Sequence, residues 1–159
     1  MKILIVSDTH GKQENLLTIL DRVKPIDRMI HLGDAEGQED LIAEMAECPL
    51  DIVAGNNDFF SSLEREKELQ IGKYKILLTH GHYYYVNMGL SDIMQEGKAR
   101  GMDIVMFGHT HRPVIEYGDG IIALNPGSVS YPRQEGKQPS YILMEFDKNG
   151  DVHFELEFL

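Results

Sequence analysis

The stretch Phe107-Gly108-His109-Thr110-His111 places two histidines directly after an apolar run that begins at Met102. Such a run predicts a buried strand. Two histidines two positions apart in an extended segment project to the same side, and the preceding glycine allows the backbone to turn tightly. Imidazole is the commonest metal ligand in proteins, although two ordinary loop histidines would give the same short pattern. The residues at the ends of the other predicted strands are therefore needed to distinguish a metal site from an ordinary loop.

The first third of the chain alternates short apolar runs with helical patterns. The apolar runs predict strands over 2–7, 28–32 and 51–54, and each ends in a loop that contains Gly, Asp or Asn. The spacing of apolar residues between them predicts helices over 16–23 and 39–47. This alternation predicts parallel strands in an α/β fold.

The second half of the chain is richer in strands. Three hairpins are predicted, which pair 69–71 with 74–79, 114–117 with 121–124, and 141–146 with 152–158. A helix is expected over Ser91–Arg100 with Ser91 as its N-cap, and residues 64–68 are expected to be a solvated charged segment and nothing more. About ten strands are too many for one twisted sheet, so we expect two packed sheets in a single domain, 1–159.

Composition and charge exclude several classes of protein. The chain has 159 residues, of which 42% are hydrophobic, as is typical of a globular domain. The apolar runs are too short to cross a bilayer, and the N-terminus begins a strand rather than a signal peptide, so we expect no membrane association. Cys48 is the single cysteine, which fits the reducing cytoplasm. A net charge of −11 disfavours a nucleic-acid partner but not a small phosphate substrate.

Five predicted strands in succession end in side chains that can bind metals. These side chains belong to Asp8, His10, Asp34, Asn56, His80, His109 and His111. Ligands of open α/β folds bind outside the carboxyl ends of the strands, where all of these residues are expected. Mixed nitrogen and oxygen ligands favour Mn, Fe, Zn, Ni or Co over Mg and Ca. Two such ions side by side turn a bound water into a nucleophile and polarise a phosphoryl oxygen.

The order of these motifs resembles that of the calcineurin-like metallophosphoesterases. The resemblance rests on Asp8-x-His10, Gly33-Asp34-x-x-Gly37, Gly55-Asn56-x-Asp58, His80 and Gly108-His109-x-His111. The chain length, the stretch Asn125-Pro126-Gly127-Ser128 and Pro132-Arg133 are similar to the small bacterial and archaeal phosphodiesterases of that superfamily. The resemblance implies a four-layer αββα sandwich, in which two packed mixed sheets are flanked by helices.

The resemblance also implies a role for each ligand. Asp8, His10 and His111 would hold one divalent ion, and Asn56, His80 and His109 would hold a second. Asp34 would bridge the two ions, for which manganese is the first candidate and Ni, Fe, Zn, Co or Mg are the alternatives. A hydroxide between the ions would attack the phosphorus of a small phosphate ester, most often a diester, without a phosphoenzyme.

One position departs from the pattern of many relatives. Asn57 stands where they carry a histidine beside the leaving group, and an amide cannot act as a general acid. Because general acid catalysis is worth about 10²–10⁴-fold, we expect weak turnover of esters with poor leaving groups. His82 is a candidate replacement, with a solvent-facing histidine as the alternative interpretation. Arg112 is a candidate clamp for the substrate phosphate, with an ordinary surface arginine as the alternative.

Three further hypotheses remain open at this point. The fold is also used by a retromer scaffold subunit, so the chain could be a protein-binding scaffold without catalysis. Larger relatives include nucleases, which the acidic charge of this chain disfavours. An exposed edge strand or the tyrosines at 83–85 could support a homo-oligomer.

Overall fold

The computed structural model describes residues 1–159 and contains two five-stranded sheets, three α-helices and one short 3₁₀-helix. The first sheet has the order β10-β9-β1-β2-β3. Its members are β1 (Lys2–Val6), β2 (Arg28–His31), β3 (Leu50–Ile52), β9 (Ser140–Phe146) and β10 (Val152–Phe158). β1, β2 and β3 are parallel, as predicted, whereas β9 and β10 add to the sheet in antiparallel fashion.

The second sheet has the order β4-β5-β6-β8-β7. Its members are β4 (Glu66–Ile71), β5 (Tyr74–Thr79), β6 (Ile104–Met106), β7 (Val114–Tyr117) and β8 (Ile122–Asn125). β5, β6 and β8 are parallel, and the edge strands β4 and β7 are antiparallel to their neighbours. All three predicted hairpins are therefore present.

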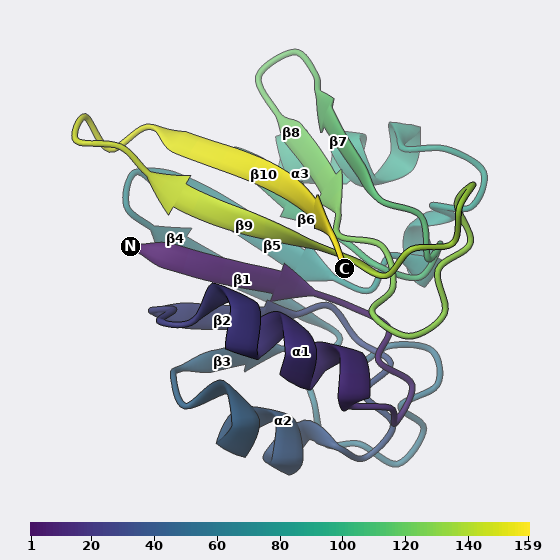
Figure 1. Cartoon of the computed structure of the whole chain (residues 1–159). Coiled ribbons are helices and arrows are strands. Elements are labelled where there is room, and N and C mark those ends of the chain that lie inside the picture. Colours follow the sequence, from purple (N-terminus) through teal and green to yellow (C-terminus); the bar gives the residue numbers. More distant parts are fainter.

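The two sheets pack face to face, and helices cover their outer faces (Figure 1). α1 (Glu14–Val23) and α2 (Glu39–Ala46) lie on the first sheet, and α3 (Ser91–Ala99) with the 3₁₀-helix η1 (His82–Tyr84) lies on the second. The layer between the sheets is filled by buried aliphatic side chains such as Ile5 from β1 and Leu78 from β5. The expected αββα sandwich is confirmed, and the carboxyl ends of its parallel strands meet at one edge.

Two local expectations are wrong. Residues 66–68 are more than a solvated charged segment, because they form the first half of β4 and pair with residues 77–79 of β5. The carboxylate of Glu66 accepts the Tyr84 hydroxyl and lies 2.9 Å from the Arg100 guanidinium. Ser91 is the first residue of α3 and not its N-cap, a position that Leu90 occupies without a side-chain hydrogen bond.

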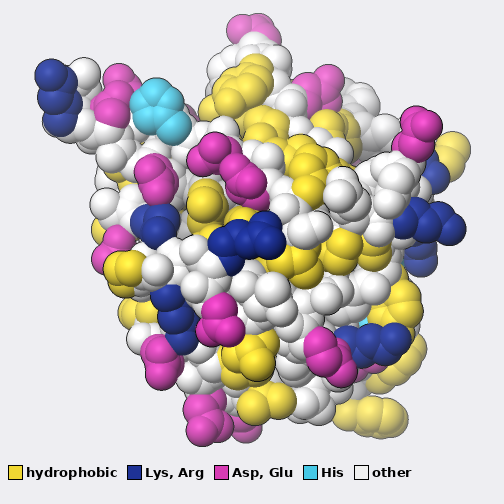
Figure 2. Space-filling model, in the orientation of Figure 1, with side chains coloured by type: hydrophobic (Ala, Val, Ile, Leu, Met, Phe, Trp, Pro, Cys, Tyr) yellow, Lys and Arg dark blue, Asp and Glu magenta, His cyan; other side chains and the backbone are white.

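The surface agrees with the charge of the sequence. Acidic, basic and apolar side chains are interspersed over the face that Figure 2 shows, and no continuous basic stripe crosses it. A stripe of that kind is the usual footprint of a nucleic-acid-binding protein. None of the helices combines the length and the apolar character that a membrane span requires.

Candidate metal centre

Side chains from the ends of five strands converge at one edge of the sandwich. They come from the loops after β1, β2, β3, β5 and β6 and include all seven residues singled out as ligands: Asp8, His10, Asp34, Asn56, His80, His109 and His111. The first four belong to loops of the first sheet and the last three to loops of the second. The centre therefore spans both sheets.

One group of ligands is formed by Asp8, His10 and His111. The Nε2 atoms of the two histidines lie 3.0 Å apart. Oδ1 of Asp8 lies 3.6 Å from Nε2 of His10 and 3.1 Å from Nε2 of His111. One carboxylate oxygen and two imidazole nitrogens thus face a common point.

A second group is formed around Asp34, whose Oδ2 lies 3.4 Å from Nε2 of His80 and 3.7 Å from Nε2 of His10. The amide oxygen of Asn56 lies 3.0 Å from Nε2 of His80 and 3.0 Å from Nδ1 of His109. Because His10 belongs to the first group, the Asp34 carboxylate lies between the two groups. This is the position that a bridging ligand requires.

Each of three ring nitrogens that face away from the centre has an acceptor. Nδ1–H of His10 donates to Glu36 Oε1 over 3.0 Å, that of His80 to the Leu32 carbonyl over 2.6 Å, and that of His111 to the Tyr131 carbonyl over 2.7 Å. These bonds fix the ring orientation and the tautomer, so that Nε2 presents its lone pair to the centre. Glu36 was not predicted from the sequence, and its place two residues after Asp34 in a glycine-bounded loop is the only signal for it.

The backbone of the centre is strained at the candidate ligands. Five of the seven have a positive φ: Asp8 (55°), His10 (48°), Asp34 (59°), His109 (69°) and His111 (57°). Residues other than glycine rarely adopt this left-handed conformation. Such strain is concentrated at functional sites, where the surrounding structure must hold it in place.

Two glycines allow the loops to approach one another closely. A Cβ atom on Gly55 would lie 2.1 Å from Oδ1 of Asp34, and one on Gly108 would lie 2.1 Å from Oγ of Ser7 and 2.7 Å from Oδ2 of Asp8. Ser7 Oγ itself donates to that Asp8 oxygen over 2.6 Å. Any larger residue at either position would displace a candidate ligand.

Asp58 ties two of the ligand loops together. Its carboxylate accepts the backbone N–H groups of Asp34 at 2.8 Å, Glu36 at 2.7 Å and Gly55 at 2.7 Å. Asp58 therefore stabilises both the loop after β2 and the loop after β3. It also keeps Asn56 and Asp34 at a fixed separation.

The two carboxylates are held in their ionised form. Burial opposes the charge of Asp8, but the adjacent imidazoles of His10, His111 and His80 outweigh it and hold the Asp8 pKa well below its usual range. Burial likewise opposes the charge of Asp34, whose pKa is lowered to about 2 by His80 and by hydrogen bonds from Asn57. Both groups are therefore anionic ligands at neutral pH.

His10 responds to these carboxylates in the opposite direction. Burial disfavours its charge, but the nearby Asp8 carboxylate and the hydrogen bond to Glu36 raise the His10 pKa to about 9. An imidazole must be neutral in order to bind a metal, so a cation that enters the centre has to displace a proton.

The donor set fits divalent transition metals. Oδ1 of Asp8 is buried and has no hydrogen-bond partner, which is costly for an anionic oxygen unless a cation binds it. Imidazole nitrogens, carboxylates and one amide oxygen suit Mn, Fe, Zn, Ni or Co. Each of the two candidate groups could hold one ion.

The three candidate catalytic residues differ in their distance from this centre. Asn57 is in contact with it, because its backbone N–H and its side-chain amide donate to the two oxygens of Asp34, each over 2.9 Å. His82 stacks near His80 and His109, with ring centroids 5.4 and 5.9 Å away. Arg112 is exposed, forms no ion pair and lines a neighbouring hollow with Thr110 and Arg133. The structure thus brings Asn57 and His82 to the centre and leaves Arg112 at its rim.

The protonation of His82 restricts its chemistry. Burial, together with the charges of His80 and His109, lowers the His82 pKa to about 4. Its buried Nδ1 has no hydrogen-bond partner. A neutral imidazole at this place can accept a hydrogen bond at neutral pH, but it is not a charged acid.

Comparison with known proteins agrees with the fold and with the cluster of ligands. The family model of the calcineurin-like phosphoesterase superfamily domain matches residues 1–149, and the chain belongs to this superfamily. A curated relative, the "probable metallophosphoesterase YsnB" of Bacillus subtilis, is 35% identical over 150 residues, which cover 94% of this chain and 86% of the relative. A phosphodiesterase of Methanocaldococcus jannaschii is 28% identical over 146 residues, covering 80% of this chain and 83% of its own.

Solved structures share the architecture. A Streptococcus pneumoniae protein described as a predicted phosphoesterase superimposes with a TM-score of 0.82 at 31% identity and covers 99% of this chain and 88% of its own. Vps29 of Entamoeba histolytica, solved as a complex with Zn²⁺, has a TM-score of 0.79 at 23% identity and covers 99% of both chains. At that identity the likeness to Vps29 concerns the fold alone.

Proposed function

We propose that the protein is a phosphodiesterase that uses two divalent metal ions to hydrolyse a small phosphate ester. The observation that carries this proposal is the place of the Asp34 carboxylate, whose Oδ2 lies within 3.7 Å of a histidine from each ligand group. Asp8, His10 and His111 would hold one ion, and Asn56, His80 and His109 the other. When bound, the ions would activate a water molecule and polarise a phosphoryl oxygen.

The side chains around the centre favour direct attack of water on phosphorus. Water adds to phosphorus, one phosphorus–oxygen ester bond breaks, and the alcohol leaves. A covalent phosphoenzyme is not expected, because the hydroxyl beside Asp8, that of Ser7, is fully buried and donates a hydrogen bond to the Asp8 carboxylate. Cys48 packs against the core below α2. Direct attack by water fits the groups that face the centre.

The leaving alcohol must obtain its proton without an imidazolium beside it. Asn57 can donate a hydrogen bond but no proton, and its amide already donates to Asp34. His82 is neutral at neutral pH for the reasons given above. We therefore propose that good leaving groups, or protons supplied by solvent, sustain turnover. Arg112, at the rim, would orient the anionic substrate.

The proposal is tested with metal-free protein that is reloaded with Mn²⁺ and assayed with bis(4-nitrophenyl) phosphate. Hydrolysis is expected, and Asp34→Asn should lower kcat/KM by at least about 100-fold, because a ligand of both ions loses its charge. Asp119→Asn, in the exposed turn after β7, is the matched control. Absence of hydrolysis with every divalent ion would refute the proposed function.

A protein-binding scaffold is the alternative, which the fold-level likeness to Vps29 favours. All seven candidate ligands are present in this chain, whereas a scaffold has no need to retain them. A pull-down that finds one dominant partner at the face opposite the centre, with no turnover of any phosphate ester, would support the alternative.

A further inference from the structure

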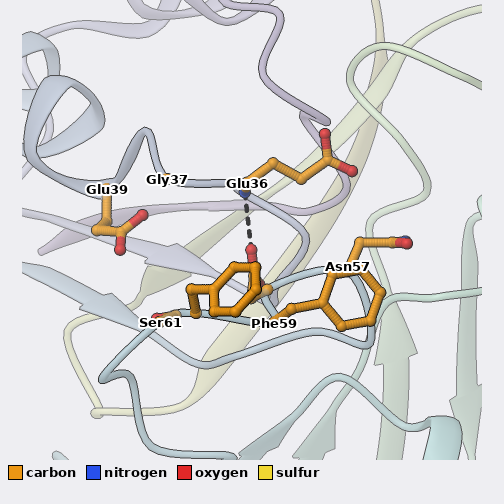
Figure 3. Close-up of a pocket in the computed structure, with 8 residues that line it drawn as sticks. Glu36, Gly37, Glu39, Asn57, Phe59 and Ser61 are labelled. Carbon is orange, nitrogen blue, oxygen red and sulfur yellow. Dashed lines mark hydrogen bonds between the residues drawn. The ribbon is translucent and has the colours of Figure 1, made fainter.

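A cavity of about 440 Å³ lies beside the candidate metal centre, between the loop after β2 and the loop after β3. It is lined by Glu36, Gly37, Glu39, Asn57, Asp58, Phe59, Phe60 and Ser61. Figure 3 shows Glu39, from the start of α2, and Phe59, from the loop after β3, on different sides of this hollow. The cavity combines aromatic rings with carboxylates.

Two lining residues also touch the candidate ligands. Asn57 donates to both oxygens of Asp34, and Glu36 accepts the Nδ1–H of His10. In Figure 3 the Glu36 carboxylate points away from Phe59. A phosphate at the centre would therefore have one ester substituent within reach of the cavity.

Several side chains of the cavity have aromatic faces or a carboxylate oxygen that no other group of the protein contacts by a hydrogen bond. Phe59 is 77% exposed and Phe60 is fully exposed, which is unusual for two adjacent aromatic residues beside a polar centre. Oε2 of Glu39 is buried and has no hydrogen-bond partner. The Asp58 carboxylate, by contrast, already accepts three N–H groups. A buried carboxylate oxygen beside exposed aromatic faces is suited to a cation, because both attract positive charge.

We infer that this cavity is a subsite for a cationic ester substituent, so that the preferred substrate is a phosphodiester of an ammonium alcohol such as choline. The inference rests on the proposed phosphodiesterase function and adds the chemical class of its substrate. The ammonium group lies over the rings of Phe59 and Phe60 and faces Glu39, while the phosphate lies at the centre. An anionic substituent is repelled by Glu39 and has no basic residue among the lining side chains.

The test compares two phosphodiesters that share a phenyl group and differ in one charge. One carries choline and the other carries 3,3-dimethylbutanol, the uncharged analogue of the same shape. Phosphorus NMR measures the consumption of both, whichever ester bond breaks. The Mn²⁺-loaded protein is expected to prefer the choline ester about tenfold in kcat/KM, in line with a cation–π contact beside a carboxylate.

Three variants assign that preference to the cavity. Glu39→Gln and the double change Phe59→Leu with Phe60→Leu are each expected to reduce the ratio about threefold or more. Asp40→Asn is the matched control, because Asp40 is exposed in the same helical turn and does not line the cavity. It should keep the wild-type ratio. Circular dichroism verifies that each variant is folded.

Direct binding gives a readout that does not depend on turnover. Saturation-transfer NMR should detect choline on the wild-type protein more strongly than 3,3-dimethylbutanol, and Glu39→Gln should remove the difference. A kinetic ratio of one or below, with both esters hydrolysed, overturns the subsite and leaves the proposed function intact. Failure to hydrolyse either ester, by protein that also leaves bis(4-nitrophenyl) phosphate intact, overturns the proposed function, and the choline signal then decides the subsite alone.

Discussion

At the scale of single residues, the candidate centre depends on hydrogen bonds that fix the ring orientation of three histidines. The acceptors on Nδ1 of His10, His80 and His111 turn the other ring nitrogen inward. His31 lies beneath this arrangement, fully buried, with Nε2 3.0 Å from the Thr9 hydroxyl and Nδ1 accepting the N–H of Gly33. It therefore connects the loop after β1 to the loop after β2.

The buried His31 predicts a loss of stability in mild acid. Burial lowers its pKa to about 4 from an ordinary value of 6.5. Between pH 6.5 and pH 4 the imidazole of His31 takes up a proton in the unfolded chain but not in the folded protein. The stability that His31 contributes above pH 6.5 is therefore lost as the pH falls toward 4. The His31 contribution to the free energy of unfolding of the metal-free protein should fall by roughly 1–2 kcal/mol between pH 7 and pH 5. His82, whose pKa is also lowered, acts in the same direction, and His10, whose pKa is raised, acts in the opposite direction.

Urea titrations at a series of pH values measure this effect. His31→Gln should flatten the pH dependence in that window, whereas His153→Gln, an exposed histidine of β10, should not. An unaltered slope in His31→Gln would show that other groups cause the acid sensitivity.

Asn57 predicts how the rate depends on the leaving group. Asn57→His would place an imidazole where this chain has an amide, and general acid catalysis accelerates the departure of poor leaving groups by about 10²-fold or more. A plot of log kcat against the pKa of a series of phenols should be steep for the wild type and shallower for Asn57→His. Equal slopes would mean that this position does not reach the leaving group.

At the scale of elements, most strands could be predicted because they are short apolar runs that end in Gly, Asp, Asn or His. The first half of β4 escaped prediction because Glu66, Lys67 and Glu68 are charged, and an edge strand can expose such residues without loss of its pairing. The clustering of the candidate ligands was predictable from their place after successive strands. The contact of Glu36 with His10 and the cavity at Phe59 depend on the conformation of loops. Loops show no hydrophobic periodicity from which that conformation could be predicted.

The ends of β1 and β6 approach each other so closely that we expect a side chain at Gly108 to be destabilising. Gly108→Ala would place a methyl group against Ser7 and Asp8, and overpacking of this kind costs about 1–3 kcal/mol. We expect that loss in urea denaturation, together with reduced metal content by elemental analysis. Gly37→Ala is the control, because nothing lies within 4 Å of its added Cβ and only its φ of +80° opposes the change. A smaller effect at Gly108 than at Gly37 would contradict the packing argument.

At the scale of the whole molecule, the candidate ions would join the two sheets. Four of the ligands lie in loops of the first sheet and three in loops of the second. A cation that binds only the folded state stabilises it by about 2.7 kcal/mol at one hundred times its Kd. Mn²⁺ should therefore raise Tm of the metal-free wild type by roughly 5–11 °C and should have little effect on Asp34→Asn. A scan in which both proteins respond equally would mean that the ion binds elsewhere.

The most direct test is an anomalous difference map from a crystal of the Mn²⁺-loaded protein. Two peaks are expected on either side of the Asp34 carboxylate, one beside His10 and His111 and the other beside His80 and His109. A map without peaks among these residues, or with imidazoles that point into separate regions, would contradict the binuclear centre.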